Sequence, residues 1–206
     1  MIQKLLVALF SAQSIKASLM FPDSSLPECN TLQMYNRTEW GAIEEGRPCE
    51  ATHFNGWNIK YLFLHHTVSP EACYDNCVEE MFSMQKFHTQ DRGWCDIGYS
   101  WVLGSDLKFY EGRGWDKEGA HTPGFNDWAY ALSIIGDYTH RLPTRSVLDR
   151  IDLFIKCSID AKRLRDSVEI RGHRQAKSTE CPGENYYHYM FMDKNFGLGP
   201  GQSFAH

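Results

Sequence analysis

The cysteine content of this chain restricts its folding more than any other feature. There are seven cysteines among 206 residues. Six of them can form three disulfide bridges, which are typical of chains that fold in an oxidising compartment. The odd count leaves one thiol over, and an unpaired thiol in such a compartment needs a reason. The spacing does not say which six pair; the candidates are Cys29, Cys49, Cys73, Cys77, Cys95, Cys157 and Cys181.

The N-terminus indicates the export that such bridges require. Lys4 supplies a positive charge, an apolar run follows from Leu5 to Phe10, and small residues come after it. We interpret residues 1–18 as a secretory signal peptide, with a frayed first helix as the alternative. No later segment is apolar for long enough to cross a membrane. We therefore expect a secreted, extracellular protein, and the sequon Asn36-Arg37-Thr38 fits a surface loop of one.

Charge and aromatic content narrow the classes of partner. The formal net charge is −5, which gives no indication of binding to nucleic acid or to an anionic membrane. Aromatic residues make up 14% of the chain, which fits either a surface that stacks on sugars or a core rich in tyrosine and phenylalanine. Composition alone favours the core.

Strand-like and helix-like segments follow an irregular beginning. We expect residues 19–58 to form an N-terminal arm tied down by Cys29 and Cys49, and residues 197–206 to form a flexible tail. The mixture between them predicts an α/β fold, a single domain with a central mixed β-sheet flanked by helices and stabilised by disulfides. Within this domain, 59–196, we expect a buried strand over 60–68, a helix over 77–90, a hairpin over 99–114, a strand over 130–138, a helix over 143–164, a short strand over 168–170 and a helix over 185–192.

The expected helix over 77–90 has two faces. An apolar stripe predicts the buried side, and the polar residues opposite predict the solvent side. The stripe consists of Val78, Met81, Phe82 and Phe87, and the polar side of Glu79, Glu80, Gln85 and Lys86.

Three side chains could bind a metal ion. His65 ends the first apolar strand, His173 follows Gly172 after the last strand, and Cys181 lies in a Pro-Gly loop. Two histidines and one thiolate are a known catalytic zinc set, because three protein ligands leave a fourth position open for water. A structural zinc site needs a fourth ligand, and the chain has no Cys-x-x-Cys pair. The spacing leaves alternatives open: Cys181 as half of a disulfide or a small buried residue, and His65 as a satisfied core group.

Five motifs occur along the chain in a fixed order. They are HHT at 65–67, RGWCDIGYS at 92–100, GRGW at 112–115, GAHTPGFN at 119–126 and GHRQ…TECPG at 172–183. Together they resemble the peptidoglycan recognition protein family, which shares its fold with the bacteriophage-type zinc amidases. The likeness runs from about Cys29 to Phe196, nearly the whole chain after the expected signal peptide.

The resemblance implies a catalytic site with Zn²⁺ as its cofactor. In catalytic members the first histidine of HHT, the histidine of GHRQ and the cysteine of TECPG bind zinc; here these are His65, His173 and Cys181. The tyrosine of DIGYS and the threonine two positions before the cysteine complete the catalytic set; here they are Tyr99 and Thr179. Members that only bind usually lack the cysteine, often with serine in its place. The resemblance thus implies an N-acetylmuramoyl-L-alanine amidase and explains the odd cysteine.

The other six cysteines match the bridges usual in the family. The resemblance implies the pairs Cys73–Cys77, Cys29–Cys157 and Cys49–Cys95. The CYDNC spacing is tighter than the family's usual spacing for the first pair, and we expect this bridge to form nonetheless.

The implied substrate is the bond between N-acetylmuramic acid and L-alanine in the stem peptide of peptidoglycan. The implied partners are bacterial peptidoglycan and muropeptides, and the implied role is innate immunity or control of bacteria. The alternative is a non-catalytic peptidoglycan-binding, pattern-recognition or bacteriostatic protein. We expect the substrate in a cleft between the strand ends and the segment 110–128, in contact with His88, Trp94, Arg113, Gly114, Trp115, His121 and Asn126.

Two features bear on the type of stem peptide, and they conflict. The pair Gly114-Trp115 tends to accompany diaminopimelate-type peptides in the family. The family's arginine after the GD(W/F) motif, which meets the extra carboxylate of such peptides, is absent from Gly136-Asp137-Tyr138-Thr139. We lean slightly toward diaminopimelate. The general base is left unassigned; His66 could support a metal ligand or simply pack at the strand end.

Overall fold

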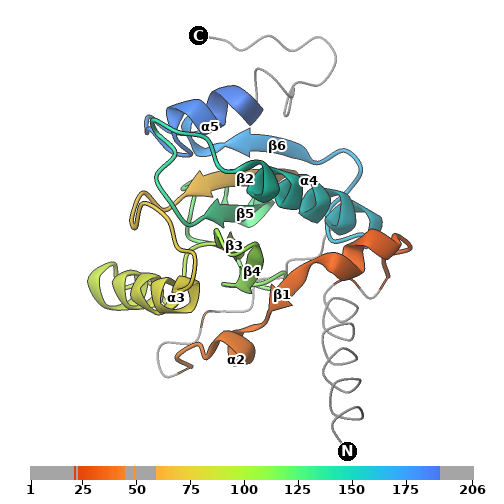
Figure 1. The fold of residues 1–206 in the computed structure, drawn as a ribbon. Coiled ribbons are helices and arrows are strands. Elements are labelled where there is room, and N and C mark those ends of the chain that lie inside the picture. Colours follow the sequence, from red (N-terminus) through yellow and green to blue (C-terminus); the bar gives the residue numbers. More distant parts are fainter. Residues whose placement is uncertain (1–20, 22, 45–48, 50–58, 191–206) are drawn as a thin grey trace, which may run out of the picture.

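One six-stranded mixed sheet organises the structure. The computed structural model describes residues 21, 23–44, 49 and 59–190, so the expected signal peptide and tail lie outside the described residues. The strands follow the order β1-β4-β3-β5-β2-β6 (Figure 1). β3 and β4 pair antiparallel, and every other neighbouring pair is parallel. The α/β prediction, with a central mixed sheet between helices, is confirmed.

The elements lie close to their expected positions. The expected hairpin is β3 and β4, and the long amphipathic helix is α4. The strands are β1 (Gln33–Tyr35), β2 (Tyr61–His66), β3 (Trp101–Leu103), β4 (Lys108–Glu111), β5 (Ala129–Ile134) and β6 (Glu169–Gly172). The helices are α2 (Arg37–Trp40), α3 (Cys77–Lys86), α4 (Arg145–Asp160) and α5 (Glu184–His188), and a π-helical turn, Phe87–Asp91, continues α3.

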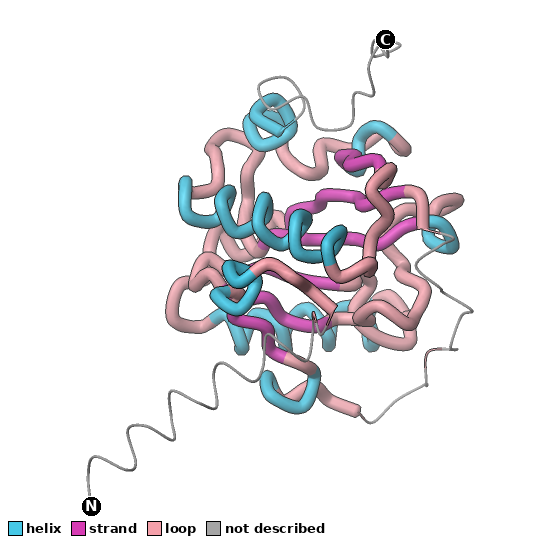
Figure 2. Tube along the Cα trace, turned by 90° about the vertical axis from the view of Figure 1, so that its right-hand side faces the viewer, coloured by secondary structure: helices cyan, strands magenta, loops and turns pink. Residues whose placement is uncertain are grey.

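α4 covers one face of the sheet (Figures 1 and 2). Thr144 is the N-cap of the helix, and its Oγ1 accepts a hydrogen bond from the backbone N–H of Val147 at 3.4 Å. Its apolar residues recur every three or four positions, so one side of the helix is buried. Phe154 lies at the centre of this side and is stacked on Phe109 of β4, with 4.7 Å between the ring centroids. This contact makes the layer between α4 and the sheet the main core.

α3 covers only part of the opposite face. Met81 of α3 packs in a second core cluster with Val102 of β3 and Tyr110 of β4, and this cluster contains no residue of β2 or β6. Side chains of a strand alternate between faces, so Phe63 and His65 of β2 point to the same side as Val102 and Tyr110. α3 therefore packs over β3 and β4, and a cavity between α3 and the end of β2 remains beside it.

The polar side of α3 differs from the expectation in one respect. Gln85 is only 2% exposed, although the pattern places it on the solvent side. Its amide donates to the carbonyl of Ile43 at 2.9 Å and to Asp96 Oδ1 at 3.1 Å, and its Oε1 accepts from the Ile43 N–H at 2.9 Å. Gln85 is buried because it ties the N-terminal region and the 96 loop to the helix.

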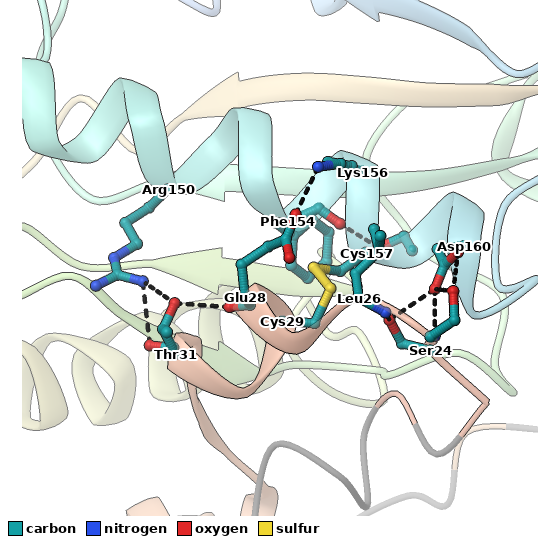
Figure 3. Close-up of a disulfide and its surroundings, with 12 residues drawn as sticks. Ser24, Leu26, Glu28, Cys29, Thr31, Arg150, Phe154, Lys156, Cys157 and Asp160 are labelled. Atoms are coloured by element: carbon teal, nitrogen blue, oxygen red, sulfur yellow. Dashed lines mark hydrogen bonds and ion pairs between the residues drawn. A yellow bond between two sulfur atoms is a disulfide. The ribbon is translucent and has the colours of Figure 1, made fainter.

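The N-terminal arm is more regular than expected. After a short helical turn, Pro27–Thr31, the chain forms β1, which pairs with β4 in the main sheet, and then α2. Figure 3 shows this turn docked on α4. The Cys29–Cys157 disulfide joins the two, and Lys156 Nζ lies 2.6 Å from Glu28 Oε1. The interpretation of the arm as irregular is therefore wrong for the described part of it, because non-local pairing orders it.

The expected cysteine pairing is confirmed. The bridges are Cys29–Cys157, Cys49–Cys95 and Cys73–Cys77, and Cys181 is free. In the described part of the chain, no helix has both the length and the apolar character that crossing a bilayer demands.

Candidate metal centre

Three side chains from two distant segments converge at one edge of the sheet. β2 and β6 are parallel neighbours, and Leu64 pairs with Gly172. The next residues along the chain are His65, still in β2, and His173, directly after β6; both therefore lie at the same edge, with 4.6 Å between the ring centroids. Cys181 follows in the loop after β6, and its Sγ lies 3.5 Å from His65 Nδ1. The candidate ligand atoms of these three residues all lie within 4.8 Å of one another.

The protonation of the three groups suits a cation. Burial lowers the pKa of His65 well below its usual value and also lowers the pKa of His173, so both imidazoles are neutral and carry a free lone pair. Burial raises the pKa of the Cys181 thiol to about 12. A bound cation would offset that effect by stabilising the thiolate.

The donor set fits zinc. His173 Nε2 is buried and has no hydrogen-bond partner, so this ring has a nitrogen that no protein group occupies. Imidazole and thiolate are preferred zinc ligands, and three of them leave one position for a reactant. We conclude that His65, His173 and Cys181 can hold a divalent cation of this kind.

Tyr99 and Thr179 border the three candidate ligands. The ring centroid of Tyr99 lies 5.2 Å from that of His65. Burial, with a smaller contribution from Cys181, raises the pKa of Tyr99, so its phenol stays protonated and able to donate a hydrogen bond. Thr179 Oγ1 accepts from the backbone N–H of Cys181 at 3.3 Å. Both residues line the cavity that the three candidate ligands open into.

This cavity has a volume of about 670 Å³ and lies between the strand ends and α3. Of the seven residues expected to contact substrate, His88, Trp94 and His121 line it. The rings of His88 and Trp94 lie side by side, with 4.7 Å between their centroids. His88 Nδ1 accepts from the backbone N–H of Gly98 at 3.2 Å, which fixes the ring at the cavity wall.

One wall of the cavity was not predicted from the sequence. It is one face of α3 and its π-helical turn, made of Glu80, Ser83, Met84 and Phe87. Their spacing of three, four and seven residues is that of one helical face, a signal that could have identified them. Phe87 was expected in the buried stripe, but it is 45% exposed because it lies at the rim of the cavity.

The other four expected contacts do not line the cavity. Arg113 donates to the backbone carbonyls of Ile97 and Glu118, at 2.8 and 2.6 Å, so its guanidinium holds loops together. Gly114 has a φ of +69°, which favours glycine at that turn. Asn126 accepts from two backbone N–H groups of its own loop.

Trp115 lies in the main core, and the expectation of a cleft-facing ring is corrected. Its ring stacks on Phe154 with 5.7 Å between the centroids and meets Tyr130 edge-on at 4.9 Å. The residue is 7% exposed and does not line the cavity. The Gly114-Trp115 pair therefore acts here through a turn and through packing.

His66 lies between this cavity and a smaller hollow of about 490 Å³. Its Nδ1 accepts from the backbone N–H of Tyr138 at 3.2 Å and lies 3.8 Å from Asp137 Oδ1. Burial lowers the pKa of His66 to about 4. Thr139 stands where the resemblance implies an arginine that this chain lacks, and it lines the smaller hollow.

The stability of the metal-free protein is expected to fall in mild acid because of His88. Burial, with help from Arg113 and Arg92, lowers the pKa of His88 from 6.5 to about 4. The unfolded chain then binds more protons than the folded chain between these values, so stability is lost as the pH falls from 6.5 toward 4. His88 alone accounts for about 2 kcal/mol between pH 7 and pH 5.

Denaturant titrations at pH 7 and pH 5 measure this loss. The His88→Gln variant keeps an acceptor for the Gly98 N–H and cannot titrate, so its free energy of unfolding should change less between the two pH values. Equal pH dependence of the parent and the variant would contradict the assignment.

Comparison with known proteins identifies relatives that match most of the chain. A family model described as N-acetylmuramoyl-L-alanine amidase matches residues 55–184. Peptidoglycan-recognition protein LB of Drosophila melanogaster is 37% identical over 155 residues, which are 74% of this chain and 65% of that protein. N-acetylmuramoyl-L-alanine amidase of Homo sapiens is 41% identical over 156 residues, which are 73% of this chain but 26% of that protein. The chain thus spans less than two thirds of both.

Two other matches extend the comparison. Peptidoglycan-recognition protein 1 of Holotrichia diomphalia is 34% identical over 153 residues, covering 74% of this chain and 76% of that protein. The structure of wild-type Drosophila peptidoglycan-recognition protein LB superposes with a TM-score of 0.74 at 34% identity, covering 82% of this chain and 99% of that chain. The structure of a variant of the same protein in complex with tracheal cytotoxin superposes with a TM-score of 0.73 at 34% identity, covering 80% of this chain and 96% of that chain.

Proposed function

Because this chain belongs to the N-acetylmuramoyl-L-alanine amidase family, with peptidoglycan-recognition proteins as its relatives, we propose that it is a zinc-dependent amidase. Its reaction is hydrolysis of the bond between N-acetylmuramic acid and L-alanine in the stem peptide. The observation that carries this proposal is the free Cys181, which lies with His65 and His173 in a set of donors that fits zinc. Binding peptidoglycan without cutting it requires no thiolate ligand, so the free thiol favours the amidase over the binding-only alternative.

The three candidate ligands hold the ion in this proposal. When bound, zinc lowers the pKa of a water molecule to near 7 and polarises the substrate carbonyl. Cys181 binds as the thiolate, so its proton leaves when the ion enters. The imidazoles of His65 and His173 are already neutral through burial and require no proton loss.

Tyr99 and Thr179 act on the reacting oxygen atoms in this proposal. An amide carbonyl gains negative charge on its oxygen as water adds to it, and fixed donors near that oxygen lower the barrier. The Tyr99 phenol is suited to donate there, because its raised pKa keeps the proton in place at neutral pH. The Thr179 hydroxyl already accepts from the Cys181 N–H, so its own proton is free to orient water or substrate.

The proposed substrate contacts are those that line the cavity. His88, Trp94 and His121 face it from one side, and Met84 and Phe87 give the α3 side apolar surface. The related protein in complex with tracheal cytotoxin supports a muropeptide as the ligand of this cavity. Arg113, Gly114, Trp115 and Asn126 are left out of the contact set and shape the loops around it.

Secretion is also part of the proposal. Three disulfides in a domain of this size support folding in an oxidising compartment. The predicted signal peptide over 1–18 agrees with this. Expression in a eukaryotic secretory host, followed by N-terminal sequencing of the protein in the medium, tests secretion and locates the cleavage site.

Metal removal tests the proposal directly. Purified protein should contain one zinc ion per chain and release stem peptide from purified peptidoglycan. A chelator should stop the release, and added zinc should restore it, because the metal supplies the reactive water. Binding of peptidoglycan with no release at any zinc concentration would identify a binding-only protein instead.

A phenylalanine at position 99 should slow the reaction without removing the metal. Tyr99→Phe removes one hydrogen-bond donor, and the rate of stem-peptide release should fall by about 10²–10³-fold. Zinc content should not change, because Tyr99 is not among the candidate ligands. The matched control is Tyr74→Phe, a change at a tyrosine that is 59% exposed and does not line the cavity. An unchanged release rate in Tyr99→Phe would remove Tyr99 from the catalytic set.

A further inference from the structure

We propose that Thr122 is a positioning residue that fixes the tautomer of His65 and so keeps Nδ1 of that ring free for the metal. The inference deepens the proposed function and rests on it. Thr122 was not among the residues selected from the sequence. It is completely buried, with 0% of its surface exposed, and it lies directly behind the candidate metal centre.

The two nitrogens of the His65 ring face different partners. Nδ1 lies 3.5 Å from Cys181 Sγ, on the side of the candidate ligands. Nε2 lies 3.4 Å from Thr122 Oγ1, on the opposite side. The same Thr122 oxygen lies 2.9 Å from Nδ1 of His121. One hydroxyl therefore joins the candidate ligand His65 to a second buried histidine.

Proton counting gives this chain of contacts one direction. A neutral imidazole carries one N–H, and a nitrogen that binds a metal must be the one without it. If His65 Nδ1 is the ligand atom, Nε2 carries the proton and donates to Thr122 Oγ1. The Thr122 O–H then donates to His121 Nδ1. Each proton then takes part in one hydrogen bond. If the donors and acceptors were exchanged, Thr122 would donate to His65 Nε2 and the His65 proton would lie on Nδ1, on the metal side.

The loop holds the Thr122 hydroxyl in place through its own backbone. Asn126 Oδ1 accepts from the N–H groups of His121 and Thr122, at 3.1 and 2.8 Å. The carbonyl of Thr122 accepts from the Phe125 N–H at 2.9 Å. The role of Asn126 is thus to close the loop that presents Thr122.

Gly119 makes room for the far end of the relay. A Cβ at this position would lie 2.3 Å from His121 Cδ2, closer than real contacts allow. Any side chain at 119 would therefore displace the His121 ring that accepts from Thr122. The hydrogen-bond chain from His65 through Thr122 to His121 thus depends on Gly119 and Asn126 of the same motif, 119–126, neither of which is a candidate metal ligand.

The test compares Thr122→Val with Thr122→Ser in the full mature protein. Valine has nearly the same shape and no hydroxyl, whereas serine keeps the hydroxyl. The dissociation constant for Zn²⁺ is measured by competition against a chromogenic chelator. We expect about 10–100-fold weaker zinc binding for Thr122→Val, with most of the affinity regained in Thr122→Ser. Equal affinity of the parent and Thr122→Val would overturn the inference.

A second measurement does not depend on any variant. In metal-free parental protein with ¹⁵N-labelled histidine, long-range ¹H–¹⁵N correlations at neutral pH report which nitrogen of His65 carries the proton. We expect protonated Nε2 in the parent and a mixture of the two tautomers in Thr122→Val. A proton on Nδ1 of the parent would overturn the inference even if the valine variant failed to fold.

The two proposals fail in different ways. A parent that binds zinc with a protonated Nε2 on His65 but releases no stem peptide contradicts the amidase and leaves the role of Thr122 intact. A parent that binds zinc and releases stem peptide, with Thr122→Val equal to it in zinc affinity, contradicts only the role of Thr122. A parent that does not bind zinc contradicts both.

Discussion

Cys181→Ser abolishes release of stem peptide while binding of peptidoglycan persists: this is the largest effect that we expect on activity. The substitution exchanges a thiol that can become an anionic ligand for a hydroxyl that stays protonated at neutral pH. Only His65 and His173 then remain of the three candidate ligands. Loss of the metal removes several kcal/mol of transition-state stabilisation, and each 1.36 kcal/mol is a factor of ten in rate. We therefore expect a loss of about 10³-fold or more.

The measurement pairs stem-peptide release with a pull-down on insoluble peptidoglycan. The cavity walls from α3 and from the His88 region remain in the variant, so the pull-down should change little. Ser178→Ala is the matched control, since Ser178 is an exposed small residue of the same loop. Release by Cys181→Ser at the parental rate would show that the thiol is not a ligand, and the zinc assignment would be wrong.

Loss of the Cys29–Cys157 bridge has the largest expected effect on stability. The bridge closes a loop with a sequence separation of 128 residues, whereas Cys73–Cys77 closes one of 4. Chain entropy alone predicts about 5 kcal/mol for the long loop and about 2 kcal/mol for the short one. The bridge also fastens the N-terminal turn to α4 (Figure 3).

Two double variants measure how the stabilisation by a bridge depends on the length of the loop that it closes. Cys29→Ala/Cys157→Ala and Cys73→Ala/Cys77→Ala remove the same atoms from sites that are all almost fully buried, so the effect of lost packing is similar. Denaturant unfolding of each variant, with the other bridges oxidised, gives the free energy of unfolding. A larger loss in the short-loop variant would contradict the entropic account.

The order of the regular elements could be predicted from the sequence, but the N-terminal pairing could not. β2 and α4 have strong patterns of their own, an unbroken apolar run and a 3.6-residue period. β1 is only three residues long, Gln33–Tyr35, and it exists because β4 offers a parallel partner. The burial of Gln85 likewise depends on Ile43 and Asp96, which lie elsewhere in the sequence. Such partners are not visible in a local pattern.

In the site, too, some residues could be predicted from the sequence and others depend on distant contacts. The spacing of His65, His173 and Cys181 carries little information, and the family resemblance supplied the ligand set that the structure brings together. Trp115 shows the limit of that transfer, because a tryptophan in a motif can serve the core as readily as the cleft. Thr122 was missed because only its contact with His65 marks it, and that contact joins β2 to a loop 57 residues later.

The pairing of β2 with β6 has a consequence for the maturation of the protein. His65 sits on a strand from the first third of the chain, and His173 and Cys181 follow the last strand. A nascent polypeptide that has not yet emerged beyond β5 holds one donor and has no chelate to offer. In the proposed function, zinc can therefore bind only after β6 and the loop that carries Cys181 have been synthesised, and a copy that is truncated before β6 would lack two of the three candidate ligands.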